Sequence, residues 1–245
     1  MAMKALLRWL VLLLAALLAL QLFFLARIAL MALVNPHSSA FERSEAWRIY
    51  HDKGRLPWRQ QWADYQQISD HLKRAVIASE DDAFSYHDGV DWEAMEKAWQ
   101  KNTQAQVQAS RRAANGNSTN RPLKLVGGST ITQQLAKNLL LSGERNLLRK
   151  GQELMLTLTL EAFLSKRRIL EIYLNSVEWG DGIFGAEAAA QRYFRKSAAQ
   201  LSPSEAARLA VMLPSPKFFE TRQGSAYLAR RTGTIVARMG DVSPP

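Results

Sequence analysis

The chain has 245 residues, and its 32 Lys and Arg against 22 Asp and Glu give a formal net charge of +10. With 47% hydrophobic residues it is long and apolar enough to bury a sizeable core, so general disorder is excluded. It contains no cysteine, which excludes disulfide frameworks, thiolate nucleophiles and cysteine-ligated metal centres, and its four scattered histidines lack metal-ligand spacing.

An apolar run opens the chain. Residues 9–26 carry no charge, and residues 28–34 are apolar again. This length can cross a hydrocarbon core of ~30 Å, whereas a cleaved signal peptide, the competing interpretation, usually has only ~7–15 apolar residues. We therefore predict a retained transmembrane helix within residues 1–35. Lys4 and Arg8 favour a cytoplasmic N-terminus.

The rest of the chain, residues 36–245, is expected to form one mostly α-helical domain. Residues 1–35 hold three cations and no acid, so this domain carries a net charge of +7. Such a charge suits anionic lipid headgroups, a phosphate-bearing ligand or nucleic acid.

Apolar residues at helical spacing mark the elements of this domain. They predict one helix that begins after Ser69 and others over about residues 91–99, 131–139, 144–164, 166–174, 186–194, 203–213 and 226–239. A Ser-Pro-Ser-Glu capping box begins at Ser202, and Gly240 is placed as the cap of the last helix. Residues 100–122 are polar and are predicted to form a mobile loop. No stretch shows the alternation of a strand.

Three carboxylates, those of Glu80, Asp81 and Asp82, stand at the end of the helix that begins after Ser69, just before a turn at Gly89. Acids at the C-terminus of a helix oppose its dipole at a cost of ~0.3–1 kcal/mol each. They are either ordinary surface acids or groups kept there for a function.

A second segment places Gly127 and Gly128 before a helix. Two glycines let the backbone approach a ligand, and free N–H groups at a helix start suit an anion. Gln133 and Lys137 are four residues apart and are predicted to share a helix face. The alternative is an ordinary amphipathic helix with a Ser/Thr cap. The order of glycines and lysine is not that of a P-loop.

A third segment places Arg145, Arg149 and Lys150 before Glu153. Arg149 and Glu153 have the spacing of a structural ion pair, worth only ~0.3–0.5 kcal/mol. The alternative is a carboxylate held beside cations that also bind phosphate.

Together these segments resemble the signature motifs of the peptidoglycan glycosyltransferase family, whose lysozyme-like domain polymerises lipid II. The motifs occur in family order over about residues 69–217. The first matches Glu80-Asp81-x-x-Phe84-x-x-His87-x-Gly89, the second residues 127–138, the third Arg149-Lys150-x-x-Glu153, the fourth residues 169–175 and the fifth residues 206–214. With the chain ending at Pro245, no penicillin-binding transpeptidase domain is expected, so the resemblance is to the monofunctional members.

The resemblance implies a transmembrane anchor, residues 1–35, followed by a single lysozyme-like helical domain, residues 36–245. The protein would cross the bacterial inner membrane once, with the catalytic domain on the periplasmic side. It would transfer the growing lipid-linked glycan onto the 4-hydroxyl of lipid II, with inversion and release of polyprenyl diphosphate.

Roles for individual residues follow from the same resemblance. Glu80 corresponds to the general base, and Glu153 to a second carboxylate that steadies the donor or a metal ion. Cations for the diphosphate and positioning residues are expected at Lys137, Arg145, Arg149, Ser129, Gln133 and Gln134. His87 is either structural or functional, whereas Glu171, Tyr173 and Asn175 are interpreted as scaffold.

The resemblance requires no cofactor. A divalent cation, Mg²⁺ or Mn²⁺, at the donor diphosphate is compatible with it, with Glu153 as the candidate ligand. The expected partners are lipid II, lipid-linked glycan and the membrane, with cell-division or wall-synthesis proteins as further candidates. Nucleic acid is not expected, because the cations cluster around carboxylates without a recognisable binding module.

Two rival functions differ in which of these residues they require. A membrane-anchored, lysozyme-like lytic enzyme would need one catalytic glutamate but no cations for a diphosphate. A non-catalytic binder of wall precursors would need neither Glu80 nor Glu153. Product analysis separates these possibilities, because polymerisation lengthens glycan and releases lipid diphosphate.

Overall fold

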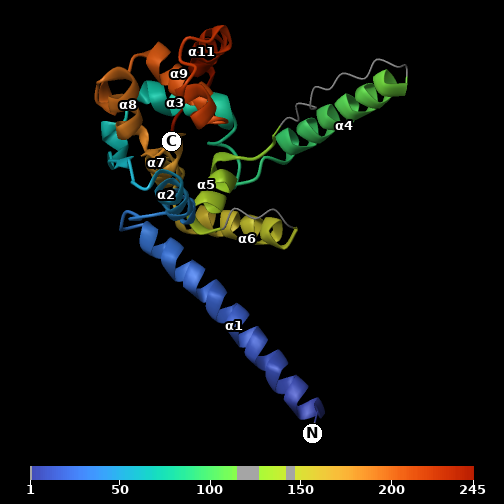
Figure 1. Ribbon diagram of the computed structural model, residues 1–245. Coiled ribbons are helices and arrows are strands. Elements are labelled where there is room, and N and C mark those ends of the chain that lie inside the picture. The colour runs from blue at the N-terminus through green and yellow to red at the C-terminus, as the bar shows by residue number, and fades with distance from the viewer. Residues whose placement is uncertain (1, 115–126, 142–146) are drawn as a thin grey trace.

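The structure, a computed structural model, describes residues 2–114, 127–141 and 147–245 (Figure 1). The prediction of a mostly helical protein with an apolar N-terminal helix is confirmed. The α-helices are α1 (Ala2–Met31), α2 (Ala40–Lys53), α3 (Asp70–Glu80), α4 (Trp92–Ala114), α5 (Ile131–Leu140), α6 (Leu147–Phe163), α7 (Lys166–Ser176), α8 (Ala186–Phe194), α9 (Pro203–Met212), α10 (Pro216–Glu220) and α11 (Ala226–Arg238).

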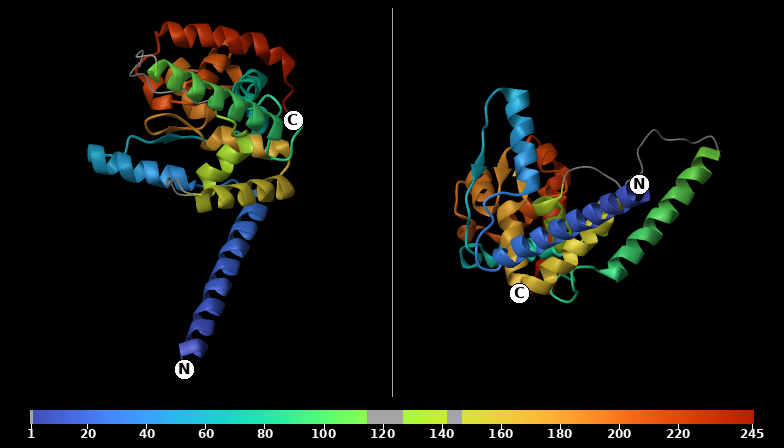
Figure 2. Two further views of the ribbon diagram at one scale, coloured as in Figure 1. Left: turned by 90° about the vertical axis from the view of Figure 1, so that its right-hand side faces the viewer. Right: turned by 90° about the horizontal axis from the view of Figure 1, so that it is seen from below.

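Helix α1 extends away from the folded domain, as Figure 1 and the left view of Figure 2 show. Its length and composition are sufficient to cross a membrane, and its most apolar stretch has no buried residue. Its middle lies against α6, where the side-chain amides of Gln21 and Gln152 hydrogen bond to each other at 3.1 and 3.2 Å. Exposed leucines along the rest of α1 suit a hydrocarbon environment.

The last turn of α1 belongs to the core of the domain. Ile28 is fully buried and Met31 is 4% exposed, and both join the main hydrophobic cluster. Arg168 on α7 donates to the Met31 carbonyl at 2.8 Å and to Asn35 Oδ1 at 2.7 Å. The predicted boundary after residue 35 therefore assigns Ile28 and Met31 to the anchor, although both pack in the core of the domain.

We predict that two truncations differ in stability. A chain that lacks residues 1–26 keeps Ile28 and Met31, whereas one that lacks residues 1–35 loses both and two acceptors of Arg168. Loss of a buried Ile or Met costs ~2–5 kcal/mol each. Both chains should fold, but the shorter should have a free energy of unfolding lower by at least about 3 kcal/mol. Urea unfolding in detergent measures this, and equal stabilities would show that the last turn of α1 contributes nothing.

Helix α2 was not among the predicted elements. It begins with a capping box in which Ser39 and Glu42 exchange side-chain and backbone hydrogen bonds. It ends at Gly54, whose φ of 65° is the left-handed conformation typical of a glycine cap. Both boundaries of α2 were therefore marked in the sequence, the start by the Ser-x-x-Glu capping box and the end by the glycine.

Helices α3, α9 and α11 pack against one another, and α5 packs against α6 and α7. Helix α3 is capped by Ser69, as predicted, and buries Leu72, Val76 and its neighbours on one side. Helix α9 has the predicted capping box from Ser202 and a proline in its first turn. The C-terminal end of α3 lies close to the N-terminal end of α5, where the N–H of Ile131 donates to Asp81 Oδ2 at 2.9 Å.

The prediction of a loop over residues 100–122 is wrong for the part that the structure describes. Helix α4 continues to Ala114 and projects from the body (Figure 1), while residues 115–122 lie outside the described residues. The segment is polar, but Ala, Gln, Lys and Arg are good helix formers, so intrinsic propensity rather than an apolar face explains the helix. Trp92 and Trp99 on α4 remain 67% and 75% exposed.

A small sheet also departs from the prediction that no strand occurs. Strands β1 (Arg59–Gln60), β2 (Glu178–Gly180) and β3 (Ile183–Phe184) form a sheet in the order β1-β3-β2, parallel between β1 and β3 and antiparallel between β2 and β3. These strands are too short to show the alternation of apolar and polar residues by which a strand is predicted. Gly240, predicted as a helix cap, instead lies within the 3₁₀ turn η3 (Met239–Asp241). Two further 3₁₀ turns are η1 (Tyr65–Gln67) and η2 (Ala198–Gln200).

Candidate active site

Glu80 is the last residue of α3, and its carboxylate faces a cavity of about 290 Å³, here called the Glu80 pocket. Gln134 Nε2 donates to Glu80 Oε2 at 3.1 Å, and the Ser79 hydroxyl donates to Oε1 at 3.3 Å. Burial raises the pKa of Glu80, with a smaller contribution from Asp81, against these hydrogen bonds and the charge of Arg231. The pocket is lined by Ala78, Ser79, Glu80, Asp81, Asp82, Asp91, Ala94, Gly127, Gly128, Ser129, Thr130 and Arg238.

The carboxylates next to Glu80 both have partners within the protein. Asp81 Oδ2 accepts from the backbone N–H of Ile131 at 2.9 Å, so its charge lies at the N-terminus of α5, where the helix dipole stabilises it. Its other oxygen is 2.9 Å from His87 Nε2. The N–H of Gly89 donates to His87 Nδ1, so Nε2 carries the proton and donates to Asp81. Asp82 is exposed and pairs with Arg238 at 2.9 Å.

These contacts favour the alternative of a capped helix for the glycine-rich segment. Two N–H groups at the start of α5 already have acceptors, because Asp81 accepts from Ile131 and the Thr130 side chain accepts from Gln133. A Cβ on Gly128 would lie 3.2 Å from the backbone of Met95, so this glycine permits close packing against α4, and it also lines the Glu80 pocket. Ser129 lies exposed at the rim of the Glu80 pocket.

Gln134, rather than Gln133, shares the cleft face of α5 with Lys137. Gln133 is 3% exposed, and its side chain completes the capping box of α5 by accepting from the Thr130 N–H at 3.1 Å. Gln133 and Lys137 are four residues apart on α5, as predicted, but the side chain of Gln133 is buried. Gln133 is held in the helix cap and does not reach the cleft.

Gln134 also links two cavities. It bonds to Glu80 on one side and, on the other, lines a cavity of about 430 Å³, here called the Lys137 pocket. The Tyr173 hydroxyl donates to Gln134 Oε1 at 3.0 Å, which fixes the amide so that its N–H₂ points at Glu80. The Lys137 pocket is lined by Ala40, Phe41, Ser44, Glu45, Gln134, Lys137, Asn138, Leu141, Arg149, Val177, Glu178, Leu213 and Pro216.

Burial in the core raises the pKa of the Tyr173 hydroxyl well above its usual value, and the charge of Glu80 acts in the same direction. The hydroxyl therefore stays protonated and keeps donating. Glu171 and Asn175 are scaffold, as interpreted: Glu171 accepts from the Tyr65 N–H, and Asn175 bonds to both backbone groups of Ala63.

Glu153 on α6 is 4% exposed and forms ion pairs with two cations. Its Oε2 accepts from Arg149 at 3.2 Å, and its Oε1 accepts from Lys150. Arg149 lines the Lys137 pocket, but Glu153 itself does not. The structure thus brings Lys137, Arg149 and Gln134 to one cleft, with Glu153 behind Arg149. Arg145 lies outside the described residues.

A divalent cation at Glu153 fits these contacts poorly, because both carboxylate oxygens are already used by cations. Elsewhere in the described part of the chain, carboxylate oxygens of Glu45, Glu178 and Asp181 lie within 4.8 Å of one another. Three cations, on Lys217, Arg48 and Lys53, already pair with these acids. The charge of these three acids is thus already matched by cations of the protein.

Glu45 and Glu178 are cleft residues that the sequence did not reveal. Glu178 lies in β2, is 7% exposed, and has Lys217 Nζ 3.3 Å from its Oε1 without an aligned hydrogen bond. Burial raises the pKa of Glu178 to about 7, and the charges of Glu45 and Asp181 add to this effect while Lys217 opposes it. No local pattern points to either residue, because each reaches the cleft only through tertiary packing.

The raised pKa of Glu178 predicts a pH-dependent cost to folding. The cost is absent below its ordinary pKa of 4.5, grows as the pH rises, and is complete above about 7, because the folded state disfavours the ionised form. Glu178→Gln should remove this cost. The difference in free energy of unfolding between the variant and wild type should therefore grow by about 2–3 kcal/mol, in favour of the variant, from pH 5 to pH 8. Urea unfolding of both proteins at the two pH values tests this. A stability difference that does not change with pH would contradict it.

Comparison with known proteins gives a consistent result. The family model for Transglycosylase matches residues 53–240. The chain is 49% identical over 245 residues to the biosynthetic peptidoglycan transglycosylase of Herminiimonas arsenicoxydans, covering 99% of both chains. The corresponding protein of Janthinobacterium sp. (strain Marseille) is 48% identical over 244 residues, again covering 99% of both. That of Burkholderia orbicola (strain MC0-3) is 50% identical over 228 residues, or 93% of this chain and 86% of the relative.

Proposed function

The chain belongs to the family of biosynthetic peptidoglycan transglycosylases, and on this premise we propose how it polymerises glycan strands. The donor is the growing glycan on a polyprenyl diphosphate, and the acceptor is lipid II. The 4-hydroxyl of the acceptor sugar attacks the anomeric carbon of the donor, the diphosphate leaves, and the configuration inverts.

Glu80 acts as the general base. The attacking hydroxyl must lose its proton as the new bond forms, and a carboxylate with a raised pKa accepts a proton more readily than an ordinary one. Burial supports this role, because it raises the pKa of Glu80. Gln134, fixed by Tyr173, holds the carboxylate by one oxygen and leaves the group oriented toward the Glu80 pocket.

Lys137 and Arg149 stabilise the negative charge that grows on the departing diphosphate. Both line the Lys137 pocket, and Gln134, which also lines it, bonds to Glu80. The general base and the cations for the leaving group are therefore next to each other. Fixed cations aimed at a leaving group act mainly in the transition state. Arg145 is proposed for the same task on the basis of its motif position.

Glu153 is a positioning residue in this proposal. Its two ion pairs hold Arg149 and Lys150 in place, so its contribution comes through Arg149 rather than by contact with the sugar. No step is assigned to a metal ion. Ser129 at the rim of the Glu80 pocket is proposed to contact the donor sugar.

The protein is proposed to cross the inner membrane once through α1, with residues 36–245 on the periplasmic side. The length and apolar surface of α1 support the anchor, and Lys4 and Arg8 support the orientation. A lipid-linked substrate would then reach the cleft from the membrane in which the enzyme itself is held.

The observation that carries this proposal is the connection, through Gln134, between a buried carboxylate and a pocket with Lys137 and Arg149. Incubation of the purified protein with lipid II, followed by sizing of the product, tests it. Long glycan and free polyprenyl diphosphate are expected. Cleavage of preformed glycan without either product would instead favour the lytic enzyme.

A further inference from the structure

A basic cavity lies beside the cleft and has no part in the chemistry described so far. It measures about 620 Å³ and is called the Arg59 pocket here. Six cations and two acids line it, together with Pro57, Ile183 and Thr221. The cations are Arg48, Lys53, Arg55, Arg59, Arg192 and Lys217, and the acids are Asp181 and Glu220.

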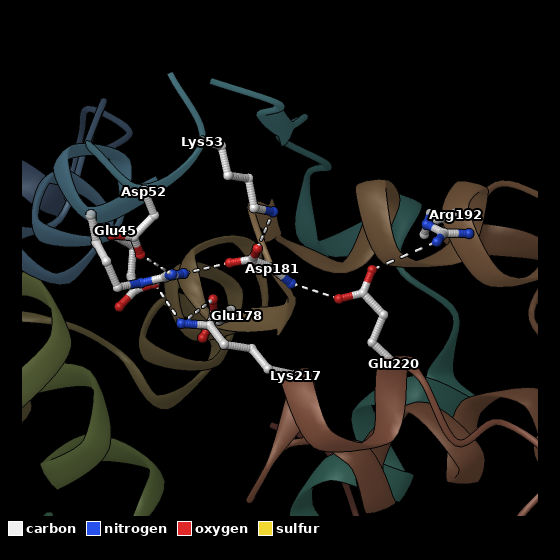
Figure 3. A network of polar contacts seen from close by, with 9 residues as sticks. Glu45, Asp52, Lys53, Glu178, Asp181, Arg192, Lys217 and Glu220 are labelled. Carbon is white, nitrogen blue, oxygen red and sulfur yellow. Dashed lines mark hydrogen bonds and ion pairs between the residues drawn. The ribbon is translucent and has the colours of Figure 1, made fainter. Parts of the chain in front are cut away.

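Four of these cations are paired with acids, as Figure 3 shows for the network around Asp181. Lys217 contacts Glu45 and Glu178, and Arg192 lies 3.6 Å from Glu220. For the side chains of Arg55 and Arg59, no hydrogen bond or ion pair occurs within residues 2–114, 127–141 and 147–245. Their charges are therefore available to an anion that enters the pocket.

The wall that carries Arg59 is rigid. Arg59 lies in β1, and its N–H donates to the Gly182 carbonyl at 2.8 Å. Gly182 has a φ of +79°, and a Cβ there would lie 2.3 Å from the Pro57 carbonyl oxygen. Only glycine can therefore occupy position 182, and the segment around Pro57 packs directly against it. The backbone of Arg59 is therefore fixed, and binding of an anion has to order only the exposed side chains of Arg55 and Arg59.

A bridge of three charged residues separates the Arg59 pocket from the cleft. Lys217 contacts Glu45 and Glu178 (Figure 3). It lines the Arg59 pocket, whereas these two partners line the Lys137 pocket. The two pockets are therefore separated by side chains that pair with one another. An extended peptide spans ~3.3–3.6 Å per residue, so a flexible peptide of a few residues is longer than a lysine side chain.

We propose that the Arg59 pocket binds the carboxylates of the peptide carried by the substrate's muramyl sugar. This inference rests on the proposed function, since it requires lipid II in the cleft. The peptide ends in a carboxylate, and arginine binds carboxylates with paired, charge-assisted hydrogen bonds. Arg55 and Arg59 are the residues that recognise it.

The experiment compares two substrates and three full-length proteins in detergent. One substrate is lipid II with its peptide intact, and the other is lipid II with every peptide carboxylate converted to an amide. The proteins are wild type, Arg55→Glu/Arg59→Glu, and a control, Arg112→Glu/Arg230→Glu, with the same change of charge at exposed positions on α4 and α11.

The double variant should raise the KM for intact lipid II at least tenfold, with kcat changed less than twofold. The KM for the amidated substrate should stay the same, and the control should match wild type. Wild type alone should show a higher KM for the amidated substrate, so the test does not depend on folding of the variant. Equal KM values for the two substrates in wild type would overturn the inference.

Two other results are distinguishable from these. If wild type polymerises neither substrate, the proposed function itself has failed. Phosphatidylglycerol mixed into the detergent micelles tests whether the pocket holds a lipid headgroup. If this lipid changes the turnover of wild type but not that of the Arg55/Arg59 variant, and wild type has equal KM values for the two substrates, the pocket binds phospholipid and the peptide inference is wrong.

Discussion

Replacement of Glu80 by glutamine should lower the rate of lipid II polymerisation about 10²–10⁴-fold. Glutamine has nearly the same shape but cannot accept the proton of the attacking hydroxyl. Substrate binding should largely survive, so the loss should appear in kcat rather than in KM. Initial rates of polymer formation over a range of lipid II concentrations measure both constants.

The matched control is Asp82→Asn, which removes a carboxylate from the same pocket two residues along the chain. Asp82 is exposed and paired with Arg238, so its loss should change the rate less than threefold. In wild type, kcat should fall at acid pH with a midpoint above 4.5, the ordinary pKa of a glutamate, because burial raises the pKa of Glu80. Near-normal turnover by Glu80→Gln would show that another group is the base.

Lys137→Ala should cost roughly 2–4 kcal/mol of transition-state stabilisation, a loss of about 30- to 1000-fold in turnover. Positive charge at the Lys137 pocket matters most while the diphosphate departs, so kcat should fall more than the affinity for the acceptor. Arg145→Ala should behave in the same way. The measurement is the steady-state rate on lipid II and, separately, on purified glycan strands.

Lys137→Arg keeps the charge and should recover much of the rate, whereas Lys101→Ala on the exposed surface of α4 should have no effect. A lytic enzyme releases no diphosphate and should be indifferent to Lys137. Cleavage of bare glycan at equal rates by wild type and Lys137→Ala would therefore reject the synthase mechanism.

Local interactions explain which elements could be predicted from the sequence. Helix α8 has the predicted bounds, and α9 begins at the predicted box from Ser202, because capping and turn residues act within a few positions along the chain. Missed elements had weaker signals or none. Helix α4 beyond Trp99 lacks an apolar face, and the strands contain only two or three residues each.

The site shows where spacing alone is insufficient. Gln133 and Gln134 are neighbours on α5, and either could stand beside Lys137 on a helix of 3.6 residues per turn. The choice depends on which side of α5 packs against α6 and α7 and on the Thr130 cap, which uses the side chain of Gln133. Gln134 is thereby left to connect Glu80, Tyr173 and the Lys137 pocket.

The sequence by itself determined the helical class, the apolar N-terminal helix and the order of the motifs, because periodicity and short-range spacing are properties of the chain. Only the tertiary structure decided that Ile28 and Met31 join the core and that α2 forms a wall of the cleft. It alone placed Lys217 against Glu45, 172 positions away in the chain. Such contacts depend on how whole helices pack, and the spacing of residues along one helix carries no information about the partner on another.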